Sequence, residues 1–270
     1  MPTLYIIATP IGNLEDVSLR ALRILSEVAL IAAEDTRKTR RLLSAYGIKT
    51  RLTSYHEHNK EAKLSYLLGR LEREDVALVS EAGMPGISDP GYELVVAAAQ
   101  SGISIVPIPG PSVLITALAV SGLATDQFVY VGFLPRKKGQ RRRFLEQIAK
   151  EERTIIAFES PHRLVTTLRD MLDVLGERRI AVCRELTKIH EEVFRGAVSA
   201  AVEYFREPRG EFTLVIEGRS KSETALTAPV EGELRRLYEQ GFSAKDAVSQ
   251  VAKATGVSKR ELYKLWLRLS

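Results

Sequence analysis

Short apolar runs alternate with amphipathic segments along the first half of the chain, and this alternation constrains the fold more than any other feature. The apolar runs are LYIIA, ALIAAED, VALVS and ISIVPIPG, which begin at Leu4, Ala29, Val76 and Ile103. Helical spacing of apolar residues follows at residues 18–25, 60–72, 92–101 and 111–121. Strands of a parallel sheet are continuously apolar because helices cover both faces. The pattern predicts an α/β domain.

A second set of apolar runs follows the first. It consists of FVYVGFL, TIIAFES, IAVCREL and EFTLVIEG, which begin at Phe128, Thr154, Ile180 and Glu211. Helical patterns near residues 141–150, 163–175 and 198–205 separate most of these runs. A chain of 270 residues exceeds a typical single domain and favours two modules with separate cores. We therefore expect two α/β domains, at residues 1–125 and 126–220.

The C-terminal part of the chain differs from both halves. Residues 221–229 are polar and without periodicity, which predicts a linker. Residues 230–270 show three helical patterns separated by Gly241 and Gly256. This punctuation predicts a small all-α, helix-turn-helix-like module of three helices.

The charge balance favours anionic partners. Lys and Arg outnumber Asp and Glu by 39 to 34, and the isoelectric point is about 9.3. A basic surface without a partner is the alternative. The single Cys183 excludes an internal disulfide, and no Cys/His cluster has zinc spacing, so we expect no metal. No apolar run approaches the roughly 20 residues needed to span a bilayer, and we expect a cytoplasmic protein.

Unusual turns follow the strands predicted for the first domain. The stretch SEAGMPGISDPG after Val79 contains three glycines and two prolines. Three others are ATPIGNLED, EDTRKTRR and PIPGPSV. Ligands of open α/β sheets bind beyond the carboxyl ends of strands, so these turns are expected to line one crevice. The alternative is long, ordered turns. The chain lacks G-x-x-x-x-G-K-[ST] and G-x-G-x-x-G, which argues against a P-loop or an ordinary dinucleotide site.

The same segments, in order, resemble one family. LYIIATPIGNLEDVSLRAL, AAEDTRKTRRLL, SEAGMPGISDPG, PIPGPSVLITALAVSG, GFLPRK, FESPHRL, CRELTKIHEEVFRG and GEFTLVIEG are similar to the small-subunit ribosomal RNA methyltransferases of the tetrapyrrole-methylase-like class. The resemblance extends from about Leu4 to Gly218, and the C-terminal helices fit the extra module of that family.

The resemblance implies a fold, a cofactor and a reaction. It implies a cofactor cleft between two α/β domains of tetrapyrrole methylase type, S-adenosyl-L-methionine as methyl donor, and a homodimer. The implied acceptor is the ribose 2′-hydroxyl of a cytidine in the decoding region of 16S rRNA, as naked rRNA or in the assembled small subunit. By position, the implied cofactor-binding residues are Pro10, Gly83, Ile87, Ser88, Ser112, Val113, Phe158, Glu159, Leu186 and Thr213.

Methyl transfer to a ribose hydroxyl requires alignment of the hydroxyl and a group that accepts its proton. Glu81 and Asp89 lie in the turn after the third apolar run. We expect one of them to position the substrate hydroxyl and name both as candidate catalytic residues. The structural alternative for Asp89, which precedes Pro90, is a turn cap.

A dense basic run favours RNA over a small metabolite. Residues 135–144 contain six cations and no acid, and such density gains affinity by releasing counterions from a phosphate backbone. The expected RNA-binding residues are Arg136, Lys137, Lys138, Arg141, Arg142 and Arg143. A solvated loop is the alternative. The C-terminal module carries more Lys and Arg than Asp and Glu, and either RNA or protein contact fits its pattern.

Two other function classes compete with this interpretation. A tetrapyrrole or other small-metabolite methyltransferase on the same scaffold leaves the basic run and the terminal helices unused. A non-catalytic nucleic-acid-binding protein leaves the four turns unexplained.

Overall fold

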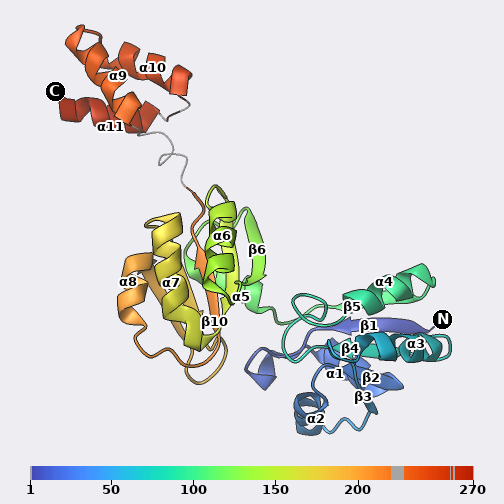
Figure 1. Cartoon of the computed structure of the whole chain (residues 1–270). Helices are drawn as coiled ribbons and strands as arrows, with labels where there is room; N and C mark the ends of the chain where they lie inside the picture. Colours follow the sequence, from blue (N-terminus) through green and yellow to red (C-terminus); the bar gives the residue numbers. More distant parts are fainter. Residues whose placement is uncertain (1, 220–227, 256, 258, 270) are drawn as a thin grey trace.

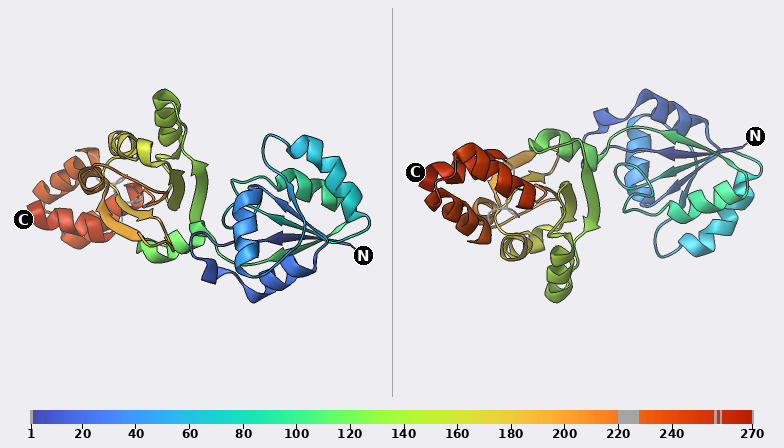
Figure 2. Two further views of the ribbon diagram at one scale, coloured as in Figure 1. Left: turned by 90° about the horizontal axis from the view of Figure 1, so that it is seen from below. Right: turned by 90° about the horizontal axis from the view of Figure 1, so that it is seen from above.

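The chain forms two α/β domains and a separate bundle of three helices (Figures 1 and 2). The structure is a computed structural model and describes residues 2–219, 228–255, 257 and 259–269. None of the helices in these ranges has the length and apolar character needed to cross a lipid bilayer.

The first domain is built on five parallel strands in the order β3-β2-β4-β1-β5. Its elements are β1 (Thr3–Ile7), η1 (Leu14–Asp16), α1 (Leu19–Glu27), β2 (Leu30–Ala33), α2 (Thr36–Ala45), β3 (Leu52–Ser54), α3 (Lys60–Leu71), β4 (Val76–Val79), α4 (Tyr92–Gln100) and β5 (Ser104–Ile108). The predicted parallel sheet is confirmed. The short strand β3 was not predicted because its three residues carry too little apolar pattern.

Helices cover both faces of this sheet, as the continuous apolar runs indicate. One core cluster joins Leu4 and Leu78 to α3 and α4, and the other joins Ile7 and Val79 to α1 and α2. Helix α2 begins where it does because Asp35 accepts hydrogen bonds from the backbone N–H groups of residues 37 and 38. The carboxyl ends of β2 and β4, with the turns that follow them, thus lie at one edge of a rigid sheet.

The second domain is built on a mixed sheet in the order β6-β7-β10-β8-β9. Its elements are β6 (Phe128–Phe133), α6 (Lys138–Ile148), β7 (Thr154–Glu159), α7 (Pro161–Leu175), β8 (Arg179–Arg184), β9 (Glu192–Ala197), α8 (Val198–Tyr204) and β10 (Phe212–Ile216). Strands β6 and β7 are parallel, and β10 runs antiparallel to both β7 and β8. Strand β9, which pairs antiparallel with β8, was not predicted.

The linking helix α5 (Val113–Ser121) packs on the second sheet. Its buried Ala117 and Leu118 contact Ile156, Cys183 and Val215 in one cluster. The sequence boundary at residues 125 and 126 had assigned this helix to the first domain. Because its apolar side faces the second sheet, we propose that the chain crosses between the domains ahead of α5, near residues 109–112.

The C-terminal helices form a small core of their own. They are α9 (Ala228–Glu239), α10 (Ala244–Thr255) and α11 (Lys259–Leu269). Leu234, Val251, Leu262 and Trp266 are buried together in this bundle, as expected for the all-α module. Of the expected linker at 221–229, residues 221–227 lie outside the described residues, and α9 begins at Ala228.

Candidate active site

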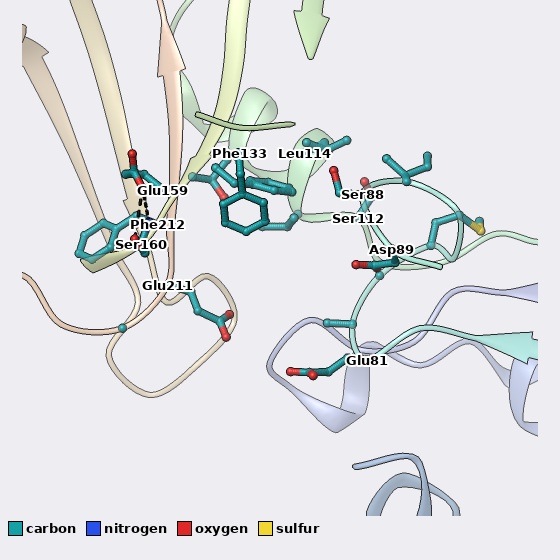
Figure 3. Close-up of a pocket in the computed structure, with 18 of the residues that line it drawn as sticks. Glu81, Ser88, Asp89, Ser112, Leu114, Phe133, Glu159, Ser160, Glu211 and Phe212 are labelled. Carbon is teal, nitrogen blue, oxygen red and sulfur yellow. Dashed lines mark hydrogen bonds between the residues drawn. The ribbon is translucent and has the colours of Figure 1, made fainter. Parts of the chain in front are cut away.

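A pocket with a cavity volume of about 410 Å³ lies where the two α/β domains meet (Figure 3). The first part of the chain contributes Glu34, Glu81, Ala82, Gly83, Met84, Ile87, Ser88, Asp89, Ser112, Val113 and Leu114. The second domain contributes Phe133, Phe158, Glu159, Ser160, Pro161, Gly210, Glu211, Phe212 and Thr213. The volume is in the range of small-molecule sites, roughly 300–1,000 Å³.

The loop after β4 forms one wall of the pocket. Gly83, Gly86 and Gly91 have positive φ angles of 77°, 81° and 152°, and Ser88 has one of 65°. Gly83 is fixed to the loop after β1 by two backbone hydrogen bonds with Thr9, of 2.9 and 3.0 Å. A stretch of backbone with this many left-handed residues requires glycine, which explains the composition of the turn.

Two contacts hold the domains together beside the pocket. The hydroxyls of Ser88 and Tyr130 are hydrogen-bonded, which joins the β4 loop to β6. On the other side, the backbone N–H of Asn13 donates to Thr187 Oγ1 over 3.1 Å. Gly12 lies so close to the β8–β9 loop that a Cβ on it would come within 2.6 Å of Thr187 Oγ1 and 2.9 Å of the Leu186 carbonyl oxygen.

Three carboxylates gather on the first-domain side of the pocket. Burial, together with the nearby charges of Glu34 and Glu81, raises the pKa of Asp89 to about 7. Glu81 forms an ion pair with Lys38 of α2. Glu34 accepts a hydrogen bond of 3.0 Å from the backbone N–H of Glu81. Asp89 therefore lies in a negative environment and exchanges its proton near neutral pH.

Aromatic rings and a buried acid form the opposite wall. Phe158 packs edge-on against Tyr130 and Phe133, with centroid distances of 5.2 and 5.4 Å. Glu159 is only 2% exposed. Its carboxylate accepts hydrogen bonds of 2.7 Å from the Ser160 N–H and the Thr167 hydroxyl, and it is ion-paired with Arg163 at 2.5 Å. These bonds hold Glu159 at the carboxyl end of β7.

The lower edge of the pocket in Figure 3 contains Glu211, which the sequence interpretation missed. It precedes β10, whose direction is opposite to that of β7, so the amino end of β10 meets the carboxyl end of β7. Glu211 Oε2 is 3.0 Å from Lys188 Nζ. Ligands of α/β sheets are expected beyond the carboxyl ends of strands, but Glu211 precedes its strand. The sequence does not show that β10 is antiparallel to β7, so Glu211 could not be predicted as a site residue.

The structure brings most of the predicted site residues together. Eight of the ten expected cofactor-binding residues line the pocket, and Pro10 and Leu186 do not. Both candidate catalytic residues, Glu81 and Asp89, line it as well. Leu186 is 6% exposed and belongs to the core under α5. Three of the four expected turns contribute residues to the pocket lining. The turn after β1 does not line the pocket, but its Thr9 is hydrogen-bonded to Gly83, which does.

The basic run at residues 135–144 is only partly available to a partner. Arg141 is 2% exposed, and its guanidinium lies 2.6 and 2.9 Å from Asp170 Oδ2. Arg142 is ion-paired with Asp170 and Asp173. Arg141 is thus corrected from an RNA-binding to a structural residue, because its charge is buried and neutralised within the domain. Arg136, Lys137, Lys138 and Arg143 are exposed.

The charges of the pocket favour a cationic ligand. Among the described residues that line it there are five acids and no Lys or Arg. Cations outside the lining pair with Glu81, Glu159 and Glu211, whereas no ion pair within the described residues neutralises Glu34 or Asp89. The apolar side chains of Ile87, Val113 and Phe158 offer contact to a flat, uncharged group. In the described residues, no group of three or more His, Cys, Asp and Glu side chains could hold a metal ion.

Comparison with protein families matches two parts of the chain. Residues 3–202 match the tetrapyrrole (corrin/porphyrin) methylases. Residues 224–270 match the RsmI C-terminal HTH domain.

Similar proteins cover nearly the whole chain. A protein of Halalkalibacterium halodurans named ribosomal RNA small subunit methyltransferase I is 50% identical over 98% of this chain and 94% of its own. A protein of the same name from Escherichia coli O157:H7 is 45% identical over 97% and 93%. Among solved structures, a cobalt precorrin-4 methyltransferase is 19% identical over 79% and 94%, with a TM-score of 0.58. A diphthine synthase has a TM-score of 0.61 at 14% identity, over 80% and 90%.

Proposed function

The chain belongs to the tetrapyrrole methylases, in the ribosomal RNA small subunit methyltransferase I family, and from this premise we propose that it methylates a cytidine of 16S rRNA. Family membership makes it an rRNA methyltransferase that uses S-adenosyl-L-methionine. The proposed acceptor is the ribose 2′-hydroxyl of a cytidine in the decoding region. The observation that carries the site assignment is the acidic pocket between the two domains, which combines turns from both.

The residues of the pocket fit the methyl donor. When bound, S-adenosyl-L-methionine supplies an activated methyl group on a positively charged sulfonium. Glu34 and Asp89 line the pocket without an ion-pair partner among the described residues, so they can face the positive sulfonium. Ile87, Val113 and Phe158 provide apolar contact for its adenine, and the hydroxyls of Ser88, Ser112 and Thr213 provide polar partners. These residues, with Gly83 and Glu159, form the proposed cofactor site, and Pro10 and Leu186 support it from outside the lining.

Asp89 is the residue we propose as proton acceptor. A ribose hydroxyl is a weak nucleophile until its proton is removed, and a base is most effective when its pKa lies near the working pH. Asp89 meets this condition, with a pKa of about 7. Glu81, which forms an ion pair with Lys38, helps to place the hydroxyl. Both roles require the ribose to enter the pocket from the side where these two acids lie.

RNA as substrate is supported by features outside the pocket. Arg136, Lys137, Lys138 and Arg143 form an exposed basic surface that follows β6, and we propose that it contacts phosphates of the rRNA. The C-terminal bundle is the second proposed contact, to rRNA or to a protein of the small subunit. We further propose that the protein works in the cytoplasm.

We also propose a homodimer. Leu19, Tyr92 and Ile189 are 86%, 70% and 98% exposed, and an interface between two copies would remove such side chains from water. Light scattering coupled to size-exclusion chromatography measures the mass directly. A monomer at micromolar concentration would contradict this part of the proposal.

Labelled methyl transfer tests the reaction. Small subunits and naked 16S rRNA from a strain that lacks this protein are incubated with the protein and labelled S-adenosyl-L-methionine, and the rRNA is digested to nucleosides. We expect label in 2′-O-methylcytidine, and mass spectrometry of rRNA fragments places it in the decoding region. A precorrin substrate serves as the comparison. Label in a methylated base, or transfer to the tetrapyrrole alone, would refute the proposed acceptor.

A further inference from the structure

Helix α2 and the loop after it carry an unusual density of positive charge. From Thr36 to Arg51 the chain has six cations and no acid within 16 residues. The sequence interpretation did not assign this stretch to RNA. It has as many cations as the shorter run at residues 135–144, in which the structure uses Arg141 and Arg142 for internal ion pairs.

Four of the six cations have no such internal use. Arg37 pairs with Asp35 and Lys38 pairs with Glu81. The other four are exposed, and within the described part of the chain none of them forms an ion pair or a side-chain hydrogen bond: Arg40, Arg41, Lys49 and Arg51. We call these four residues the α2 basic surface. Unpaired cations that repel one another gain most from a polyanion, because it neutralises several of them at once.

The α2 basic surface is hollowed rather than flat. One hollow is lined by Thr36, Arg37, Arg40, Arg41, Ser44 and Ala45. A second shares Arg40 and Ser44 with the first and extends over the loop to Lys49 and Arg51. Among the described residues that line the two hollows there is no acid. Guanidinium groups and hydroxyls are donors that phosphate oxygens accept.

The surface begins at the edge of the active-site pocket. Helix α2 starts directly after Glu34 and Asp35, and Glu34 lines the pocket. One turn into the helix, Lys38 pairs with Glu81 across the same edge. Figure 1 shows α2 on the outer side of the first domain, away from the basic run that follows β6. The α2 basic surface therefore lies within reach of an RNA strand that places one ribose in the pocket.

We propose that the α2 basic surface binds the phosphodiester backbone of the substrate RNA next to the target ribose. This inference rests on the proposed function and adds a contact on the first domain. A helix of 10 residues is about 15 Å long, which is enough for roughly four phosphates of one strand. A single small anion is usually bound in an enclosed site, where several donors converge on one point. The α2 basic surface is instead an open row of cations, which fits the repeated phosphates of a nucleic-acid strand.

The test compares two variants that each lose four charges. The first is R40Q/R41Q/K49Q/R51Q. The control is R73Q/K150Q/R169Q/R206Q, in which four other exposed cations, distributed over both domains and away from the pocket lining, are replaced. RNA affinity is measured by filter binding with naked 16S rRNA at several salt concentrations. Methyl transfer to unmodified small subunits gives KM and kcat, and calorimetry gives the Kd for S-adenosyl-L-methionine.

For the first variant we expect at least a tenfold increase in the Kd for 16S rRNA at physiological salt and a similar increase in KM. The slope of log affinity against log salt should decrease by about 3, because each lost phosphate contact on a single strand contributes about 0.7. We expect kcat and the Kd for S-adenosyl-L-methionine within twofold of the wild-type values. In the control variant, the changes in Kd and in slope should each be less than a third of these.

Two results would overturn the inference. One is equal RNA affinity and salt slope in both variants. The other is a raised KM for small subunits with unchanged affinity for naked 16S rRNA, which would show that the surface contacts a ribosomal protein. Because filter binding requires no methyl transfer, the α2 basic surface is tested even if the wild-type protein modifies another site. Absence of transfer by the wild type would contradict the proposed function alone.

Discussion

At the scale of single residues, the charges next to a carboxylate in a buried or half-buried position decide its role. Asp89 and Asp170 cannot be distinguished by residue type. In the structure, Asp89 lies near the acids Glu34 and Glu81. Asp170 lies 2.6 Å from the guanidinium of Arg141. A carboxylate beside other acids in a partly dry pocket holds its proton to a higher pH. A carboxylate beside a buried guanidinium serves the fold instead.

Replacement of Asp89 by Asn tests the proton acceptor. We expect kcat at saturating cofactor and rRNA to fall about 100-fold or more, because a general base contributes about 10²- to 10⁴-fold. In the wild type, kcat should rise with pH through about 7, where Asp89 loses its proton, and this rise should be absent in the variant. Asp126→Asn, at an exposed carboxylate outside the pocket, is the control. A wild-type pH profile in D89N would remove Asp89 from the mechanism.

The same substitution has a consequence for stability. The pKa of Asp89 is raised from 3.8 to about 7 in the folded protein, so the folded state binds its proton more tightly than the unfolded state. Its contribution to the free energy of unfolding is therefore complete below pH 4 and is lost as the pH rises toward 7. Urea titrations at pH 5 and pH 8 should show a smaller difference for D89N than for the wild type.

The buried pair of Arg141 and Asp170 allows a second prediction. Asp170→Asn leaves the Arg141 guanidinium in the core without a counter-charge, and we expect a loss of about 3 kcal/mol or more in the free energy of unfolding. Asp173→Asn, at a carboxylate whose side chain is 61% exposed, should change it by less than about 0.5 kcal/mol. Urea denaturation measures both. Equal stability of the two variants would contradict the structural role of Arg141.

At the scale of elements, the loop from Glu81 to Gly91 shows how backbone geometry prepares the site. Its positive φ angles turn the chain sharply enough that Ser88 reaches Tyr130 while Asp89 stays near Glu34. A non-glycine residue such as Ser88 at φ 65° stores strain of about 1 kcal/mol or more. The hydrogen bond to Tyr130 offsets this strain and places the loop against the second domain.

Gly91→Ala tests this loop. A Cβ at Gly91 would lie 3.0 Å from the Gly86 backbone nitrogen and 3.1 Å from Leu78 Cδ2, so the loop must shift. We expect the Kd for S-adenosyl-L-methionine to rise at least tenfold in calorimetry. Gly47 also has a positive φ, of 69°, but no atom lies within 4 Å of its Cβ position. Gly47→Ala should cost about 1–2 kcal/mol of stability and leave cofactor affinity unchanged, and similar affinities in both variants would contradict the prediction.

At the scale of the whole molecule, the site requires both domains, and the bundle is independent of it. The pocket combines turns from two sheets, and close contacts such as that of Gly12 with the β8–β9 loop keep them in register. The bundle buries Leu234, Leu262 and Trp266 among its own helices. We therefore expect cofactor binding to depend on residues 2–219, and we propose that the C-terminal bundle contributes to substrate selection.

Truncation after Arg219 separates these two roles. We expect the shortened protein to bind S-adenosyl-L-methionine with the Kd of the full chain, because none of the pocket residues is removed. Its KM for small subunits should rise about tenfold or more, with a smaller salt dependence, because basic contacts are lost. Unchanged KM and salt slope would show that the bundle has another partner.

The order of residues was enough to predict the two-domain α/β architecture, the parallel first sheet and the family. Strands buried on both faces are continuously apolar, and turns with left-handed backbone favour glycine. Both features can be recognised in the sequence, as in VALVS and the glycines after it. The resemblance placed Gly83, Ser88, Ser112 and Glu159 in the cofactor site, and the structure gathers them in one pocket.

Which residues face each other across the domains could not be predicted from the sequence, because it depends on how the two sheets pack. Strand direction in the second sheet brings Glu211 to the pocket, and the buried side chains of α5 pack on that same sheet. Packing also separates cations that are alike in the sequence. Arg141 is buried in an ion pair, whereas Arg40 is exposed. Local patterns report which face of an element is apolar, but the neighbour of a charge depends on how distant segments pack.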